Sequence, residues 1–212
     1  MARSKGARNA GFAAERMRLA ERLRVRLANG TAPRPSFREL AAAAGVGVAT
    51  LRHYFGDRDQ LVRELMGAHA PGAAPHLAFL RQPGETFAAS VTAASAYLAL
   101  GLRQAVVAQL HAVGLAEGLG RPPIGAAYLT EILEPLIEAV EARLAAHMAR
   151  GDMRPGDPRT AALGLVSPIV LAHLHQHALG GDATRPLDLE TFVAASADAF
   201  VRAYAADRRE DP

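Results

Sequence analysis

The chain has 212 residues, half of them apolar, which is enough for one sizeable core or for a small domain joined to a larger one. It contains no cysteine, which excludes disulfides, thiolate nucleophiles and cysteine-ligated zinc. The net charge of +3 is unevenly distributed, because residues 1–67 carry 13 Lys and Arg against 6 Asp and Glu, and residues 68–212 carry 11 against 15. A basic first third is typical either of a polyanion-binding module or of a solvated arginine-rich helix face.

The least polar stretches, residues 86–102 and 161–172, are too short or too rich in small residues to predict a membrane span. No signal-peptide pattern opens the sequence. We therefore expect a cytoplasmic protein without a membrane partner.

The apolar pattern predicts helices along the chain and no strand. From Phe12 to Leu27, apolar residues recur at helical spacing among arginines and glutamates, which predicts an amphipathic helix. Ser36, with Glu39 three residues later, has the spacing of a capping box and predicts the start of a second helix, which Gly45 ends.

A third short helix is expected from Gly47 to Tyr54, and Asp57 with Gln60 repeats the cap spacing before a fourth. Several Gly and Pro residues between Gly67 and Pro83 predict a hinge or irregular connection, where we place a domain boundary. Later helices are expected at 85–100, 103–116, 124–150, 159–179 and 188–206. Pro135 and Pro168 should kink or interrupt their helices, unless each helix begins near its proline.

The segment from Ser36 to Phe55 has the parts of a helix-turn-helix. Ala41 is small enough to let the next helix approach, and Gly45 can adopt the positive φ of the turn. Apolar side chains can then pack between the helices at Leu40, Val46 and Leu51, which leaves one face of the third helix exposed. The outward candidates, which include donors for phosphates or base edges, are Gly47, Val48, Thr50, Arg52 and His53.

These residues resemble the TetR family of transcriptional regulators. The resemblance rests on Phe37-Arg-Glu-Leu-Ala, on Ala44-Gly-Val, and on Thr50-Leu-x-x-Tyr-Phe-x-x-Arg58. It implies an all-α fold with a DNA-binding domain at 1–67, whose helix-turn-helix spans 36–55, and a helical effector-binding and dimerisation domain at 68–212. It also implies a homodimer formed by the last two long helices.

The resemblance assigns DNA contacts residue by residue. Thr50 and His53 match positions that the family commonly uses on DNA, and Arg58 replaces a usual lysine that contacts phosphate. Val48 and Arg52 depart from the family pattern, so Arg52 is expected to pair with guanine, to hold a phosphate or to remain solvated. The full predicted DNA-binding set is Ser36, Gly47, Val48, Thr50, Arg52, His53, Tyr54 and Arg58.

An effector pocket is expected among aromatic and polar-tipped residues of the later helices, although most such side chains belong to cores. The candidates are Phe79, Phe87, Tyr97, His111, Tyr128 and His173.

Two further patterns, a row of histidines and a row of glutamates, could indicate a metal site or an enzyme. His173 and His177 share a helix face while His175 points away, so helical geometry disfavours a three-histidine site. The glutamates at 131, 134, 138 and 141 form a row without a Glu-x-x-His pair, which is typical of a solvated stripe.

The sequence thus predicts a DNA-binding transcriptional regulator that has no enzymatic activity, metal or cofactor. In this hypothesis it is a repressor that leaves a palindromic operator in double-stranded DNA when a small molecule binds. A helical enzyme or metal protein, an activator, and a regulator without ligand response remain as alternatives.

Overall fold

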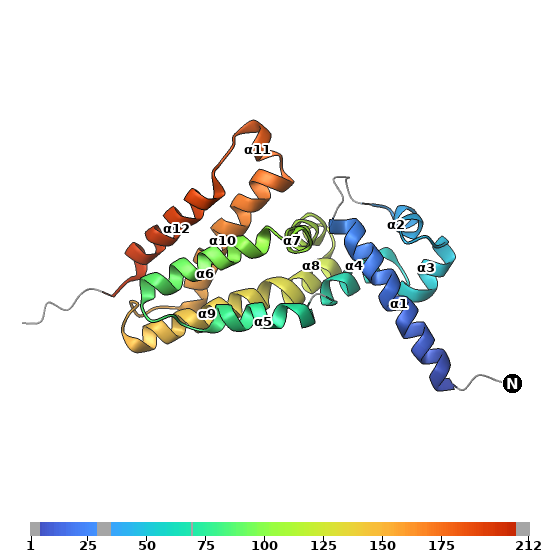
Figure 1. Cartoon of the computed structure of the whole chain (residues 1–212), viewed down its shortest axis with the longest axis horizontal. Coiled ribbons are helices and arrows are strands. Elements are labelled where there is room, and N and C mark those ends of the chain that lie inside the picture. The colour runs from blue at the N-terminus through green and yellow to red at the C-terminus, as the bar shows by residue number, and fades with distance from the viewer. Residues whose placement is uncertain (1–4, 29–34, 69, 207–212) are drawn as a thin grey trace, which may run out of the picture.

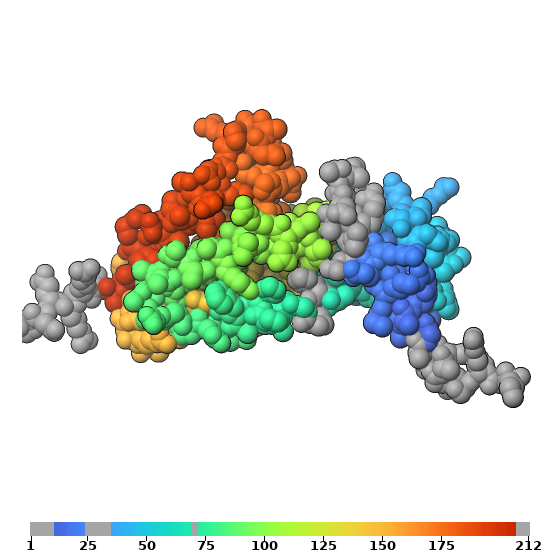
Figure 2. Space-filling view, viewed as in Figure 1, coloured from blue at the N-terminus to red at the C-terminus, as the bar shows by residue number. Residues whose placement is uncertain are grey.

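The predicted all-α fold is confirmed by a computed structural model, which describes residues 5–28, 35–68 and 70–206, with side chains at 11–23, 35–68 and 72–206. This part of the chain contains no strand, and only an isolated antiparallel bridge joins Met153 to Ala205. We call α1–α4 the head and α5–α12 the body (Figure 1). The head lies at one end of an elongated molecule (Figure 2).

The head helices are α1 (Lys5–Ala28), α2 (Phe37–Ala43), α3 (Val48–Phe55) and α4 (Arg58–Gly67). The body begins with α5 (Ala70–Arg81), α6 (Phe87–Leu102), α7 (Ala105–Gly118) and α8 (Pro122–Tyr128). A π-helix, η1 (Leu129–Leu133), leads into α9 (Glu134–Arg150), and a second, η2 (Leu174–Ala178), follows α10 (Pro158–His173). The chain then forms the short α11 (Gly181–Thr184), which was not predicted, and α12 (Leu189–Tyr204).

The predicted helix starts in the head are confirmed. Ser36 Oγ accepts a hydrogen bond from the Glu39 backbone N–H at 3.2 Å, and the Glu39 carboxylate accepts one from the Ser36 N–H at 2.7 Å. Asp57 caps α4 by accepting from the Gln60 N–H at 2.8 Å. Both caps fix where the chain turns before a helix.

Helix α4 packs into two separate apolar clusters. Its Leu61 and Leu65 belong to the head core, whereas Val62 and Met66 pack with residues of the body around α8. Because residues one position apart point to different sides of a helix, α4 is shared by head and body.

The predicted irregular connection between Gly67 and Pro83 is wrong, because α5 occupies most of it. The carbonyl groups at the end of α5 accept hydrogen bonds from the buried Arg143 guanidinium, at 2.6 Å for Phe79 and 2.7 Å for Leu80. Tertiary packing thus satisfies the helix end, and Pro75 inside α5 removes only a single backbone donor.

The two prolines of the later helices differ. Pro135 lies in the first turn of α9, directly after η1, so that helix begins near its proline as one alternative predicted. Pro168 lies inside α10 without ending it, and the π-helical segment starts only at Leu174.

Within the described residues, no single helix is long and apolar enough to cross a membrane, whereas α6 and α7, bent by 86°, satisfy the length and composition test only as a pair.

Candidate functional site

The turn between α2 and α3 has the geometry predicted for a helix-turn-helix. Gly45 has a φ of +71° and donates its N–H to Ala42, while the Val46 N–H donates to Ala41, both at 3.0 Å. This is a Schellman motif, in which a left-handed residue closes the helix and redirects the chain. Arg22 of α1 donates to the Ala44 carbonyl at 3.1 Å, which ties the turn to the first helix.

Helix α3 divides into a buried and an exposed side. Leu51 and Phe55 are fully buried in the head core. Thr50, Arg52 and His53 are exposed, as the sequence predicts for a recognition helix. Burial of Leu51 and Phe55 fixes the orientation of α3, so its polar side chains stay at the surface.

The remaining predicted contacts at α3 differ in exposure. Gly47 is the exposed N-cap, and Val48 is half-buried against the head core. Tyr54 is half-buried and stacks on Phe12 of α1 at 4.8 Å between ring centroids, and the His53 ring meets the same phenyl edge-on at 5.5 Å. The aromatic contacts fix the direction of the His53 ring.

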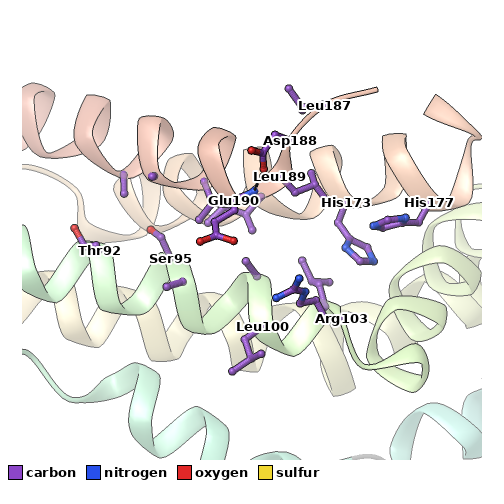
Figure 3. A pocket seen from close by; sticks show the side chains of 17 residues that line it. Thr92, Ser95, Leu100, Arg103, His173, His177, Leu187, Asp188, Leu189 and Glu190 are labelled. Carbon is purple, nitrogen blue, oxygen red and sulfur yellow. Dashed lines mark hydrogen bonds between the residues drawn. The ribbon is translucent and has the colours of Figure 1, made fainter. Parts of the chain in front are cut away.

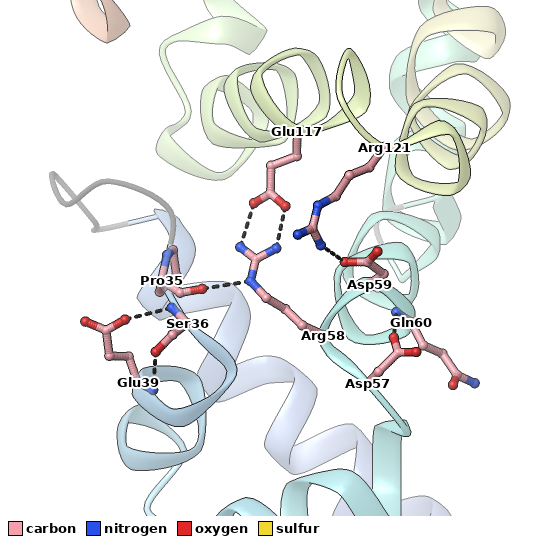
Figure 4. Close-up of polar contacts among 9 residues, drawn as sticks. All are labelled: Pro35, Ser36, Glu39, Asp57, Arg58, Asp59, Gln60, Glu117 and Arg121. Atoms are coloured by element: carbon pink, nitrogen blue, oxygen red, sulfur yellow. Dashed lines mark hydrogen bonds and ion pairs between the residues drawn. The ribbon is translucent and has the colours of Figure 1, made fainter.

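Arg58, which is expected to contact phosphate, lies between head and body. Its guanidinium forms a bidentate ion pair with Glu117 of α7 and donates from Nε to the Pro35 carbonyl at 2.8 Å (Figure 4). The Arg58 and Glu117 side chains are only 12% and 6% exposed. All three guanidinium nitrogens are thus engaged between head and body, a geometry that does not support a phosphate contact.

A second ion pair lies beside the first. Asp59, the next residue of α4, pairs with Arg121 in the turn between α7 and α8 (Figure 4). These side chains are 33% and 37% exposed, so water screens this pair more than the Arg58–Glu117 pair. We call the contact formed by the two ion pairs and the crossing of α7 with α8 the joint.

The crossing of α7 and α8 depends on glycines. A Cβ atom on Gly118 would lie 2.8 Å from the Cα of Gly125, so the two backbones are nearly in contact. At the neighbouring position Gly114 lies against the ring of Tyr128, whose hydroxyl is hydrogen-bonded to His111 Nδ1 at 2.8 Å. Burial raises the pKa of Tyr128 to about 12.

The structure does not bring the six predicted effector residues together. His111 and Tyr128 lie near the joint, and Phe87 lies in the body core against His147 and Phe200. Phe79 is 42% exposed and packs against Tyr97 with a centroid distance of 4.2 Å.

His173 lines a cavity of about 810 Å³ between α6, α10 and α12 (Figure 3). The other five predicted residues are not among those lining it.

The histidine row and the glutamate row do not converge. The His173 and His177 rings contact each other at 4.6 Å, whereas His175 is exposed and lies against Gly181. Glu134 is paired with Arg159 at 2.8 Å. Among the described residues, no group of three or more His, Cys, Asp or Glu side chains is placed to hold a metal.

The sequence analysis did not predict the polar residues that characterise the joint and the cavity. Glu117, at the joint, is the one carboxylate in an otherwise uncharged helix, which could have marked it as a partner for a distant arginine. Ser95, Arg103 and Glu190, in the cavity, come from two helices far apart in sequence and carry no local signal.

Comparison with known proteins agrees with this architecture. The model of the AefR-like transcriptional repressor C-terminal domain matches residues 91–206, and that of the bacterial regulatory proteins of the tetR family matches residues 34–65. No curated protein sequence matches the chain.

Solved structures share the fold at low identity. A protein of Mesorhizobium loti MAFF303099 assigned to the TetR family is 17% identical, with 92% of this chain and 98% of the other covered and a TM-score of 0.68. A TetR family regulator of Pseudomonas syringae pv. tomato DC3000 is also 17% identical, over 91% and 97%, with a TM-score of 0.64. SmeT, the repressor of the Stenotrophomonas maltophilia multidrug efflux pump SmeDEF, is 15% identical over 93% of each chain, with a TM-score of 0.64.

The C-terminal family model alone covers more than half of the 212 residues, and the N-terminal model covers the helix-turn-helix described above. The chain therefore belongs to the TetR family, and it is a DNA-binding transcriptional regulator rather than an enzyme.

Proposed function

We propose that the protein is a homodimeric repressor that binds a palindromic operator through α3 and leaves it when a small molecule binds the body. The division is a DNA-binding domain at 1–67 and an effector-binding and dimerisation domain at 68–212. The observation that carries this proposal is the exposed face of α3, with Thr50, Arg52 and His53 held outward by the buried Leu51 and Phe55.

On DNA, α3 enters the major groove, where Thr50, Arg52 and His53 face base edges or phosphates. An arginine that donates two hydrogen bonds to guanine contributes about 1–3 kcal/mol of discrimination against other bases. Gly47 and Ser36 lie at helix N-termini, where backbone N–H groups favour phosphate. Val48 and Tyr54 complete the predicted surface.

The homodimer forms through α10 and α12, the last two long helices. Exposed leucines on α10 support this, since Leu163 is 39% and Leu171 64% exposed although both lie on a long helix of the body. Pairing these helices with those of a second copy removes the leucines from water and sets the spacing of two recognition helices.

Release from DNA passes through the joint. Arg58 connects the start of α2, through the Pro35 carbonyl, with Glu117 of α7. A ligand that binds one arrangement of the body better than another therefore shifts the orientation of the head.

Selection of genomic fragments tests the DNA-binding proposal. Purified full-length protein is mixed with fragments of the source genome at two salt concentrations, and the bound fragments are sequenced. A near-palindromic site should be enriched, and Arg52→Ala should weaken its binding by about 1–3 kcal/mol. Arg81→Ala, which changes an exposed arginine of the body, is the matched control. Lack of enrichment at both salts, or equal losses in the two variants, would overturn the proposal.

The dimer is tested separately by sedimentation. Leu171→Glu should shift the protein toward monomer, because it buries a charge between the paired helices. Leu119→Glu places the same charge at a residue that is 88% exposed and lies outside α10 and α12, so it should leave the dimer intact. Dimers of unchanged stability in both variants would exclude this interface.

A further inference from the structure

The body contains a cavity of about 810 Å³ between α6, α10 and α12 (Figure 3). Its volume falls in the range of about 300–1,000 Å³ typical of small-molecule sites. The walls are built mainly from small apolar side chains, which include Ala96, Ala99, Ile169, Val193, Ala194 and Ala197. Such walls suit the hydrocarbon part of a ligand but provide no polar recognition.

Two opposite charges line this cavity from facing helices. Arg103 caps the C-terminus of α6, and Glu190 lies in the first turn of α12. Figure 3 shows the guanidinium on the α6 side and the carboxylate on the α12 side of the same space. Both residues are exposed, and neither side chain forms a hydrogen bond or ion pair with another group in the described part of the chain.

The other carboxylate lining the cavity already accepts hydrogen bonds from the protein, although it keeps its negative charge. Asp188 caps α12 by accepting from the backbone N–H groups of Glu190 and Thr191 and from the Thr191 hydroxyl. This leaves Glu190 as the carboxylate, and Arg103 as the permanent cation, that are available to a ligand here.

Ser95 is a buried hydroxyl in the wall of this cavity. It lines the cavity and is 0% exposed, and its Oγ has no hydrogen-bond partner among the residues that the structure describes. A buried hydroxyl normally finds a partner, because an unsatisfied one costs about 1–3 kcal/mol. His173, elsewhere in the lining, is also buried, and its ring nitrogens offer a group for hydrogen bonding.

We propose that this cavity binds a zwitterionic amphiphile, with its anionic group at Arg103, its cationic group at Glu190 and its apolar chain between α6 and α12. A purely anionic ligand would satisfy Arg103 but repel Glu190, and a purely cationic ligand would do the reverse. An uncharged hydrocarbon would gain no attraction from either charge. The link to gene control rests on the proposed function, whereas the binding itself does not.

Three surfactant monomers with the same dodecyl chain test the proposal by calorimetry with full-length protein below their micelle concentrations. The probes are dodecyl sulfobetaine, which is zwitterionic, dodecanoate, which is anionic, and dodecyltrimethylammonium, which is cationic. The unaltered protein should bind the sulfobetaine about tenfold or more tightly than either of the others, which corresponds to about 1.4 kcal/mol.

Charge-removing variants then reverse the preference. Arg103→Gln should favour the cation and Glu190→Gln the anion, each by about tenfold. Arg81→Gln and Glu85→Gln remove exposed charges that do not line the cavity, so they should keep the preference for the zwitterion. Equal affinity for the three probes, or an unchanged preference in both cavity variants, would overturn the proposal.

A second assay separates this site from gene control. Sulfobetaine is added to the complex of the protein with its selected operator, and DNA release is followed by fluorescence anisotropy. Binding that follows the predicted charge pattern without release supports the cavity site and contradicts its role as the effector site. Failure to bind any operator contradicts the proposed function and leaves the calorimetric result standing.

Discussion

The joint and the cavity differ in how closely their helices pack and in whether their charged side chains are paired. At the joint, Gly118 and Gly125 bring α7 and α8 into near backbone contact, and Glu117 pairs with Arg58 of the head. At the cavity, α6 and α12 also pack against each other but leave a space beside α10, and within the described residues the side chains of Arg103 and Glu190 form no ion pair. Close packing and paired charges favour transmission of a shift, whereas open space lined by solvated charges can accept a ligand.

Breaking the buried ion pair of the joint should have the largest effect on the free energy of unfolding. Glu117→Ala leaves the Arg58 guanidinium buried without its carboxylate, so we expect the free energy of unfolding to fall by about 3 kcal/mol. Arg121→Ala breaks the more exposed pair with Asp59 and should cost less than about 1 kcal/mol. Urea denaturation at a fixed protein concentration measures both.

A double variant separates the ion pair from other contacts of Glu117. Arg58→Met with Glu117→Leu removes both charges, so it should recover most of the stability lost in Glu117→Ala. If Glu117→Ala and Arg121→Ala cost the same, burial does not distinguish the two pairs and the joint is not centred on Arg58.

Replacing a glycine by alanine gives the next largest effect on stability. The effect should be destabilising at the joint and stabilising on α6 beside the cavity. Gly118→Ala places a Cβ 2.8 Å from the Gly125 Cα, and such overpacking costs about 1–3 kcal/mol. Gly101→Ala on α6 meets no atom within 4 Å and should stabilise the helix by about 0.5–1 kcal/mol. Thermal unfolding of the two variants measures the difference, and stabilisation by both would show that α7 and α8 are not closely packed.

Local chemistry explains what the sequence could predict. The caps at Ser36 and Asp57 and the left-handed Gly45 depend on residues within five positions of one another, and each was confirmed. Helix α5 was missed because its end is satisfied by Arg143, more than sixty residues further along the chain. Composition alone cannot show that a distant arginine will stabilise a segment rich in Gly and Pro.

The same limit applies to the functional regions. Exposure of Thr50, Arg52 and His53 follows from helical period, whereas the partner of Arg58 lies 59 residues away on α7. The cavity is assembled from three helices, and of its lining only His173 was predicted as a ligand contact beforehand. The spacing of residues within one helix predicts which of its faces is exposed, but the lining of a pocket depends on how several helices pack together.

The pH dependence of stability gives the smallest effect and belongs to the cavity. Burial, and secondly the charge of His177, lower the pKa of His173. The folded chain therefore favours the neutral ring, while the unfolded chain takes up a proton near pH 6.5. Because the unfolded state binds more protons in this window, the free energy of unfolding should decrease as the pH falls below about 6.5, until the folded pKa is reached.

His173→Gln removes this contribution, so its stability should change less with pH across that window. His175→Gln changes an exposed histidine two residues away and should keep the original slope. Denaturation midpoints at several pH values and one protein concentration compare the three proteins. If His173→Gln keeps the full slope, the buried ring does not carry the pH dependence.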